Sequence, residues 1–192
     1  MLIAYIHGFL SGPNAVKSTI LKNYINTYCK DIEFCAPDFP DVPQEAYTYL
    51  IDYFEKLQKE HDDICLVGSS MGGFFSTILS YKYNFKAALL NPCVHPQDYF
   101  VNLCGEHINP CTNRKFKLEK HMLDYLLKLD SMCKLIPSNL YVLLQDGDEV
   151  LDYKKSLSFY AQCKVEVIKG GCHTFNNFES KIPSIVDFFR SK

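Results

Sequence analysis

The chain has 192 residues, of which 47% are hydrophobic and 22% charged, a composition typical of a soluble globular domain. With 20 basic and 22 acidic residues the net charge is −2, and no basic cluster stands out, which argues against a nucleic-acid-binding protein. No apolar run reaches the roughly 18 residues of a membrane span, and the N-terminus lacks the cationic region and cleavage site of a signal peptide.

Short apolar runs alternate with helical patterns along the first half of the chain. These patterns predict strands at 2–6, 32–36, 64–68 and 86–90, and helices at 14–28, 44–60 and 71–83. In the first helix, apolar residues recur at three- and four-residue spacing: Val16, Ile20, Leu21, Tyr24, Ile25 and Tyr28. This spacing is typical of an amphipathic helix.

Residues 91–137 break this alternation with polar turns and a single amphipathic helix, predicted near 117–130. The alternation then resumes, with strands at 140–145 and 164–168 and helices at 152–161 and 178–190. We interpret 91–137 as a cap-like insertion in one domain that spans residues 1–192. On the predicted cap helix, the face formed by Leu118, Met122 and Leu126 belongs either to the core or to an acyl pocket.

The pattern predicts an α/β fold with about six mostly parallel strands and helices on both faces of the sheet. Strands that are apolar along nearly their whole length are typical of a parallel sheet covered on both sides. In such sheets ligands bind outside the carboxyl ends of the strands. The loops that follow the strands are therefore where we expect a functional site.

The loop after the third strand, Gly68-Ser69-Ser70-Met71-Gly72, fits the pattern G-x-S-x-G with Ser70 at its centre. A serine on a sharp strand-to-helix turn has strained backbone angles, and its neighbours must be small for the turn to close. The following helix would direct its N-terminal amides at the site. The alternative is a glycine-lined turn without chemistry, so the pattern by itself does not decide between them.

A serine hydroxyl becomes a nucleophile only with a base and an acid that orients the base. Such partners follow later strands in the order serine, acid, histidine. Four candidate acids follow strand 140–145: Asp146, Asp148, Glu149 and Asp152. One histidine, His173, follows strand 164–168 after two glycines. The ordered set predicts that His173 is the base for Ser70.

The loop after the first strand contains His7, Gly8 and Phe9. Acyl transfer builds negative charge on the carbonyl oxygen, which two backbone amides usually stabilise. We expect the N–H groups of Phe9 and Met71 to form this oxyanion hole, with Gly8 allowing the backbone to approach. We assign His7 a structural role within the loop.

The chain resembles the α/β-hydrolase superfamily, and most closely the small bacterial YqiA/YcfP-type esterases. The resemblance is carried by "YIHGF", "APDFP", "LVGSSMGGF", "LLNPCVHP", "LLQDGDEVLDY" and "GGCHTF", which together extend over nearly the whole length. It implies a compact α/β-hydrolase fold and a catalytic triad of Ser70 as nucleophile, Asp148 as acid and His173 as base. Asp148 is the match because an aliphatic residue follows it two positions later, and Asp146 is kept as the alternative.

Nine cysteines occur without a C-x-x-C pair, which argues against a thioredoxin-type redox site. We expect reduced thiols in a cytoplasmic protein, because the sequence shows no export signal. Five zinc-type ligands lie close together: Cys93, His95, Cys104, His107 and Cys111. Their spacing matches no standard zinc frame, so we predict no metal and no cofactor. Cys93 and Cys172, next to His173, depart from the family pattern and suggest sensitivity to thiol reagents.

The sequence thus predicts a serine hydrolase that cleaves carboxylic esters through an acyl-enzyme intermediate. An acyl-CoA or other thioesterase is the alternative enzyme, and a non-catalytic α/β-hydrolase-like binding protein is the alternative of another class. The expected partner is a small-molecule ester or thioester, with a short or medium acyl chain because the cap is short. Whether the protein forms a homo-oligomer is left open.

Overall fold

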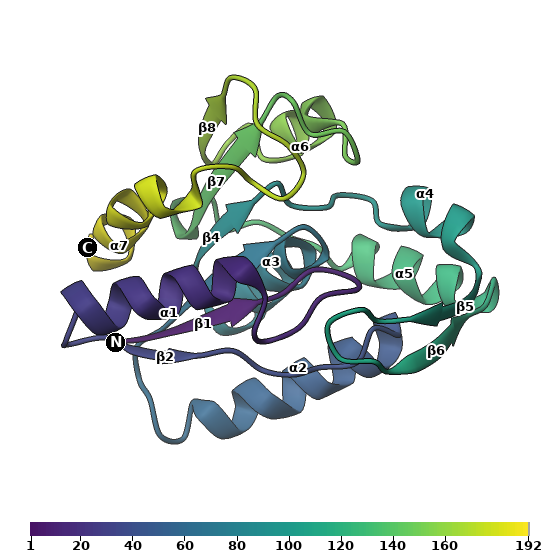
Figure 1. Ribbon diagram of the computed structural model, residues 1–192, viewed down its shortest axis with the longest axis horizontal. Coiled ribbons are helices and arrows are strands. Elements are labelled where there is room, and N and C mark those ends of the chain that lie inside the picture. The colour runs from purple at the N-terminus through teal and green to yellow at the C-terminus, as the bar shows by residue number, and fades with distance from the viewer. Residues whose placement is uncertain (192) are drawn as a thin grey trace.

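Six parallel strands form the central sheet in the computed structural model, which describes residues 1–191 (Figure 1). Their order across the sheet is β2-β1-β3-β4-β7-β8. The strands are β1 (Leu2–Ile6), β2 (Glu33–Cys35), β3 (Ile64–Ser69), β4 (Lys86–Leu90), β7 (Leu140–Gln145) and β8 (Lys164–Ile168). This arrangement confirms the predicted α/β fold, and β1, β4, β7 and β8 have the predicted bounds.

Helices cover both faces of this sheet (Figure 1). They are α1 (Val16–Tyr28), α2 (Pro43–Leu57), α3 (Met71–Tyr83), α6 (Tyr153–Phe159) and α7 (Ile182–Arg190), with a 3₁₀ turn at Phe178–Lys181. Successive side chains of β1 point to opposite faces: Ala4 and Ile6 pack in the core under α2 and α3, and Ile3 and Tyr5 in the core under α1 and α7. All four are at most 1% exposed, which explains the continuous apolar pattern of this strand.

The apolar stripe of α1 is buried only in the middle of the helix. Leu21 and Ile25 in the middle are buried, whereas Val16 is 76% and Tyr28 71% exposed. Val16 lies in the first turn at the rim of a cavity, and Tyr28 in the last turn packs against Tyr24. The helix therefore buries only its central turns on the sheet.

The segment 91–137 contains a β-hairpin that the sequence pattern did not indicate. Its elements are α4 (Gln97–Phe100), a 3₁₀ turn at Val101–Leu103, β5 (Gly105–Ile108), β6 (Lys115–Leu118) and α5 (His121–Ser131). The predicted helix near 117–130 is corrected at its start, because Lys117 and Leu118 pair with β5 in an antiparallel ladder. Leu118 is a buried apolar residue at the end of β6, and it lies four residues before Met122 of the helix. This spacing made the helical pattern extend one turn too far toward the N-terminus.

None of the helices in the described part of the chain has both the length and the apolar character of a transmembrane segment. All nine cysteines are free thiols. The buried side chains form two hydrophobic clusters, one on each face of the sheet. Each cluster is therefore built by strand residues that pack against helices.

Candidate active site

Ser70 lies at the sharp turn between β3 and α3, at the carboxyl edge of the sheet. Its backbone angles are φ 55° and ψ −120°, a conformation that residues other than glycine rarely adopt. The carbonyl oxygen of Ser70 accepts hydrogen bonds from the amides of Gly73 and Cys93, at 2.9 and 3.0 Å. The turn is thus held in a strained conformation by the surrounding backbone, as the G-x-S-x-G pattern predicts.

The glycines of this turn are required by close backbone contacts. A Cβ atom on Gly72 would overlap the carbonyl oxygens of Ile6 and His7 at the end of β1. A Cβ atom on Gly68 would lie 2.6 Å from the carbonyl oxygen of Gly72. Helix α3 can therefore begin directly against β1 only because Gly72 lacks a side chain, and can start so close to β3 only because Gly68 lacks one.

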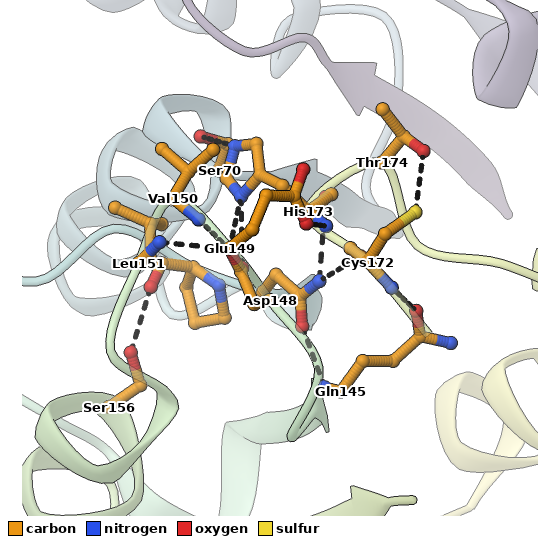
Figure 2. Close-up of polar contacts among 12 residues, drawn as sticks. Ser70, Gln145, Asp148, Glu149, Val150, Leu151, Ser156, Cys172, His173 and Thr174 are labelled. Atoms are coloured by element: carbon orange, nitrogen blue, oxygen red, sulfur yellow. Dashed lines mark hydrogen bonds and ion pairs between the residues drawn. The ribbon is translucent and has the colours of Figure 1, made fainter. Parts of the chain in front are cut away.

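The imidazole of His173 lies between Ser70 and Asp148 (Figure 2). Its Nε2 is 3.0 Å from Ser70 Oγ, and its Nδ1 is 2.9 and 3.0 Å from the two carboxylate oxygens of Asp148. Gly170 and Gly171, with φ of 75° and 80°, turn the chain after β8 so that the histidine reaches back over β3. The three residues chosen from sequence are thus brought into one hydrogen-bonded chain.

Asp148 is suited to hold a negative charge at this place. Its side chain is 2% exposed, and its Oδ1 accepts hydrogen bonds from the amides of Val150 and Leu151 at 2.9 and 2.8 Å. Burial would by itself raise the pKa of Asp148, but the hydrogen bonds from His173 and the two amides outweigh burial and hold the pKa below its ordinary value. The alternative acid, Asp146, instead accepts a hydrogen bond from the Gly170 amide.

Glu149 has a role at the site that the sequence analysis did not assign. Its carboxylate accepts the backbone N–H of His173 at 2.9 Å, and this hydrogen bond lowers the pKa of Glu149. The neighbouring Asp148 binds the side chain of the same histidine. Two adjacent acids on the β7 loop therefore fix the backbone and the ring of His173.

Two buried amide side chains, Asn91 and Gln145, support the loop that carries His173. Gln145 Oε1 accepts from the amides of Cys172 and Asn176 at 3.0 and 2.9 Å, and its Nε2 donates to the Asn176 carbonyl at 2.8 Å. Asn91 Nδ2 donates to the Cys172 carbonyl at 3.1 Å, and its Oδ1 accepts the amide of Gln145 at 2.8 Å. A polar residue at the end of each of two apolar strands is the only sequence signal that could have indicated them.

The two predicted oxyanion donors flank Ser70 from different loops. Met71 is the first residue of α3, and within residues 1–191 neither its amide nor that of Phe9 has a hydrogen-bond acceptor. A Cβ atom on Gly8 would lie 3.3 Å from Ser70 Cβ and 3.8 Å from Ser70 Oγ. The backbone before Phe9 therefore runs next to the serine hydroxyl, where a side chain would occupy the space for a substrate.

His7 takes no part in the hydrogen-bonded chain. Its ring stacks on Phe39 with the ring centres 3.8 Å apart, and Nδ1–H donates to the Gly8 carbonyl at 2.9 Å. Burial lowers the pKa of His7 below its ordinary value, so the ring is neutral at neutral pH. This arrangement agrees with a structural role in the loop after β1.

A cavity of about 760 Å³ opens beside Ser70 and His173. It is lined mainly by the segments 5–20 and 173–179. Its rim includes Lys17, whose ammonium group donates to the Thr174 carbonyl at 2.8 Å. Cys111 is the one lining residue from the segment 91–137 within the described chain. Leu118 and Leu126 are buried in the core, Met122 packs against it partly buried, and none of the three lines this cavity, so this face belongs to the core.

The five zinc-type ligands do not converge on one point. His95 Nδ1 pairs with Asp130 at 2.8 Å, and His107 Nε2–H donates to the Leu103 carbonyl at 2.6 Å. Cys93 is buried in the core, where burial raises the pKa of its thiol to about 12. Across the part of the chain that the structure covers, no three His, Cys, Asp or Glu side chains are grouped as metal ligands.

A family model described as an uncharacterised protein family, UPF0227, matches residues 1–190. Among solved structures, Est1E from Butyrivibrio proteoclasticus is similar, with a TM-score of 0.76 and 18% identity over 99% of this chain and 88% of its own. Mouse alpha/beta hydrolase domain-containing protein 10 gives a TM-score of 0.70 and 15% identity, over 97% and 88%. An esterase of Pyrococcus furiosus gives 0.63 and 14%, over 98% and 80%. At these identities the likeness concerns the fold.

Proposed function

Because this chain belongs to the UPF0227 family and has the α/β-hydrolase fold, we propose that it is a serine hydrolase that cleaves carboxylic esters. The family match confirms the predicted resemblance to the YqiA/YcfP-type members of the superfamily. The observation that carries the proposal is the hydrogen-bonded chain Asp148–His173–Ser70, with Ser70 on a strained turn. The esterase among the similar structures supports the same class of reaction.

The reaction begins when His173 Nε2 accepts the proton of Ser70 and Oγ attacks the carbonyl carbon of the ester. The negative charge that develops on the carbonyl oxygen is stabilised by the amides of Met71 and Phe9. His173 then donates its proton to the leaving alkoxide, and an acyl group remains on Ser70. Water loses a proton to the same nitrogen and attacks the acyl carbon, which releases the acid and returns the proton to Ser70.

Asp148 contributes through the imidazole and does not touch the substrate. Its carboxylate accepts the Nδ1–H of His173, which leaves Nε2 free to accept the proton of Ser70. Because the pKa of Asp148 is held low, the carboxylate stays ionised at neutral pH and stabilises the imidazolium that forms during attack.

Turnover of an activated ester, 4-nitrophenyl butyrate, tests this proposal. We expect the wild type to hydrolyse it and Ser70→Ala and His173→Ala each to lose at least ~10³ in kcat, since triad residues act as a unit. Cys172→Ser serves as the control against a thiol nucleophile and should keep most of the activity. If the wild type binds acyl compounds without turning them over, the chain is a binding protein of this fold and the proposal is wrong.

The same attack on a carbonyl cleaves thioesters, so a matched pair of substrates separates the two enzyme classes. We expect kcat/KM for a butyrate oxyester to exceed that for the corresponding thioester of coenzyme A, because Lys17 is the single lysine or arginine among the described residues that line the cavity. The phosphates of coenzyme A would require several such contacts. A higher kcat/KM for the thioester would favour a thioesterase.

A further inference from the structure

The turn of the β5–β6 hairpin lies against the loop that follows β1 (Figure 1). A Cβ atom on Gly12 would be 3.2 Å from Thr112 Cγ2 and 3.5 Å from Cys111 Cβ, so side chains of the hairpin turn pack closely on the backbone at Gly12. The loop after β1 carries Phe9, one of the two proposed oxyanion donors. The segment 91–137 thus touches the loop that would bind the oxyanion, although it contributes little to the lining of the cavity.

Two buried polar side chains join these loops. Asp41, which follows β2, accepts the backbone N–H of Leu10 at 2.9 Å through Oδ1 and the Nδ2–H of Asn109 at 2.8 Å through Oδ2. Asn109 also donates to the carbonyl of Ser11 at 2.8 Å. Asp41 and Asn109 are 9% and 1% exposed, so water competes little for these bonds.

The hairpin end of this network is itself fixed. The Oδ1 of Asn109 accepts the amides of Cys111 and Thr112 at 2.8 and 3.2 Å. Each hydrogen-bonding atom of the Asn109 amide therefore has a partner, and the orientation of the side chain is defined. Asn109 links the geometry of the hairpin turn directly to the backbone of the loop after β1.

The side chain of Phe9 is held by the same segment. Its ring packs 4.9 Å from Phe100 and 5.8 Å from Phe116, measured between ring centres, with His107 at 6.0 Å. Leu10, the next residue, has a positive φ of 55°. A backbone conformation of this kind persists only where surrounding contacts impose it. The backbone at Phe9 is thus held from two sides. The aromatic cluster fixes its side chain, and Asp41 fixes the amide of the next residue, Leu10.

We propose that Asp41 and Asn109 are positioning residues that aim the Phe9 N–H at the substrate oxyanion. This inference rests on the proposed function, because it presupposes an oxyanion that forms during attack by Ser70. It gives the segment 91–137 a role in catalysis other than that of a lid. The amide can stabilise the oxyanion only if the backbone angles around Phe9 are fixed before the substrate arrives. Asp41 and Asn109 supply that order from two segments distant in the sequence.

Asp41→Asn tests the inference with little change in volume. The amide introduced at position 41 has one acceptor oxygen for two donors, so its nitrogen would oppose the N–H of either Leu10 or Asn109, and the loop after β1 would be held less firmly. We expect kcat for 4-nitrophenyl butyrate to fall at least about tenfold, with KM within about twofold, because complete loss of an oxyanion donor costs ~10²–10³ in rate. Amide exchange of Leu10, followed by NMR, should become faster.

The reciprocal exchange provides the rescue. In Asp41→Asn combined with Asn109→Asp, the amide oxygen at position 41 can accept from Leu10, and the amide nitrogen can donate to the carboxylate introduced at position 109. The carbonyl of Ser11 still loses its donor, because a carboxylate only accepts hydrogen bonds, so the rescue is partial. We expect the kcat of this double variant to exceed that of Asp41→Asn by at least about threefold and to stay below that of the wild type. Asp38→Asn is the matched control: Asp38 precedes Asp41 by three residues and pairs with Arg114 of the hairpin, yet it has no hydrogen bond to residues 8–12 in the described chain. Its kcat should stay within about twofold of the wild type.

The outcomes separate this inference from the proposed function. If the wild type turns over the ester and Asp41→Asn leaves kcat unchanged, or if Asp38→Asn loses as much, the positioning role is wrong. If the wild type has no turnover, the proposed function fails. Amide exchange of Leu10 does not depend on turnover and then tests whether Asp41 holds the loop after β1. An unchanged exchange rate in Asp41→Asn would show that it does not.

Discussion

Asp148 combines two properties that usually oppose each other, near-complete burial and an ionised carboxylate. Burial disfavours the charge, whereas the ring of His173 and the amides of Val150 and Leu151 favour it more strongly. An acid held in this way can keep one imidazole nitrogen protonated and the other free. The chemistry proposed for Ser70 therefore depends on a carboxylate that lies beyond the reach of the substrate.

Asp148→Asn should preserve the shape of the site and lose its function. An amide can donate to Nδ1 and so stabilise the wrong tautomer of His173, which removes the free electron pair on Nε2. We expect kcat to fall by ~10⁴, measured by initial rates on 4-nitrophenyl butyrate. Asp146→Asn is the control, because Asp146 bonds the Gly170 amide and not the ring, and it should stay within about threefold. Equal losses in both variants would contradict the assignment.

The same carboxylate should leave a signature in the pH dependence of stability. Because its pKa in the folded state lies below the ordinary value of ~3.9, Asp148 stabilises the native state above that value. This contribution is lost as the pH falls through the lower, folded-state pKa. We expect the difference in free energy of unfolding between wild type and Asp148→Asn, measured by urea titration, to shrink between about pH 5 and pH 2. A difference that is constant across this range would argue against a lowered pKa.

The turn between β3 and α3 depends on how closely α3 approaches β1. Gly72→Ala would place a methyl group against the carbonyl oxygens of Ile6 and His7. We expect a loss of at least about 2 kcal/mol in the free energy of unfolding, since overpacking of this kind forces the backbone to shift. Chemical denaturation measures it, with Thr19→Ala on the exposed face of α1 as the control. A loss below about 0.5 kcal/mol, the size of a surface change, would contradict the close approach.

Gln145 connects the end of β7 to the loop that carries His173. Gln145→Leu keeps the approximate size of the side chain but leaves the amides of Cys172 and Asn176 without their acceptor. We expect destabilisation of about 2–4 kcal/mol, because each unsatisfied buried group costs ~1–3 kcal/mol. We also expect a larger effect on kcat than on KM, measured on 4-nitrophenyl butyrate. An increase in KM alone would indicate that the loop binds substrate and does not position the base.

The sequence predicted these elements well wherever one periodicity extended over a whole segment. The apolar strands β1 and β7 and helix α3 are examples, because burial on both faces leaves a continuous pattern. The hairpin β5–β6 was missed because its strands, "GEHI" and "KFKL", are short and half-exposed, and Leu118 also fitted a helix. The roles of Asn91 and Gln145 come from the pairing of β4 with β7, which local sequence does not encode.

The proposed catalytic residues all follow strands at one edge of the sheet. The loops after β1, β3, β7 and β8 supply Phe9, Ser70, Asp148 and His173. A parallel sheet brings these chain segments together regardless of their distance in the sequence. The segment 91–137 packs beside this edge and, within the described residues, contributes only Cys111 to the cavity lining. The walls of the site are therefore formed mainly by the segments 5–20 and 173–179.

An open cavity of about 760 Å³ should favour small acyl groups. A long acyl chain would extend past the rim at Val16 and Lys17 into water and gain little from binding. We expect kcat/KM to peak between acetyl and hexanoyl esters in a series that extends to palmitoyl, measured below the micellar concentration of each ester. Best turnover on palmitoyl esters would contradict this view of the cavity and imply a surface that closes over the chain.

Covalent labelling with a fluorophosphonate, mapped by peptide mass spectrometry, tests whether Ser70 is an activated nucleophile. Such a reagent reacts with a serine only when a base removes its proton and an oxyanion hole receives the developing charge. Neighbouring Ser69 offers a matched control in the same turn. The proposed mechanism predicts one adduct, on Ser70, that persists in Ser69→Ala and disappears in Ser70→Ala and His173→Ala. An unlabelled wild type, or equal labelling of Ser70→Ala, would contradict it.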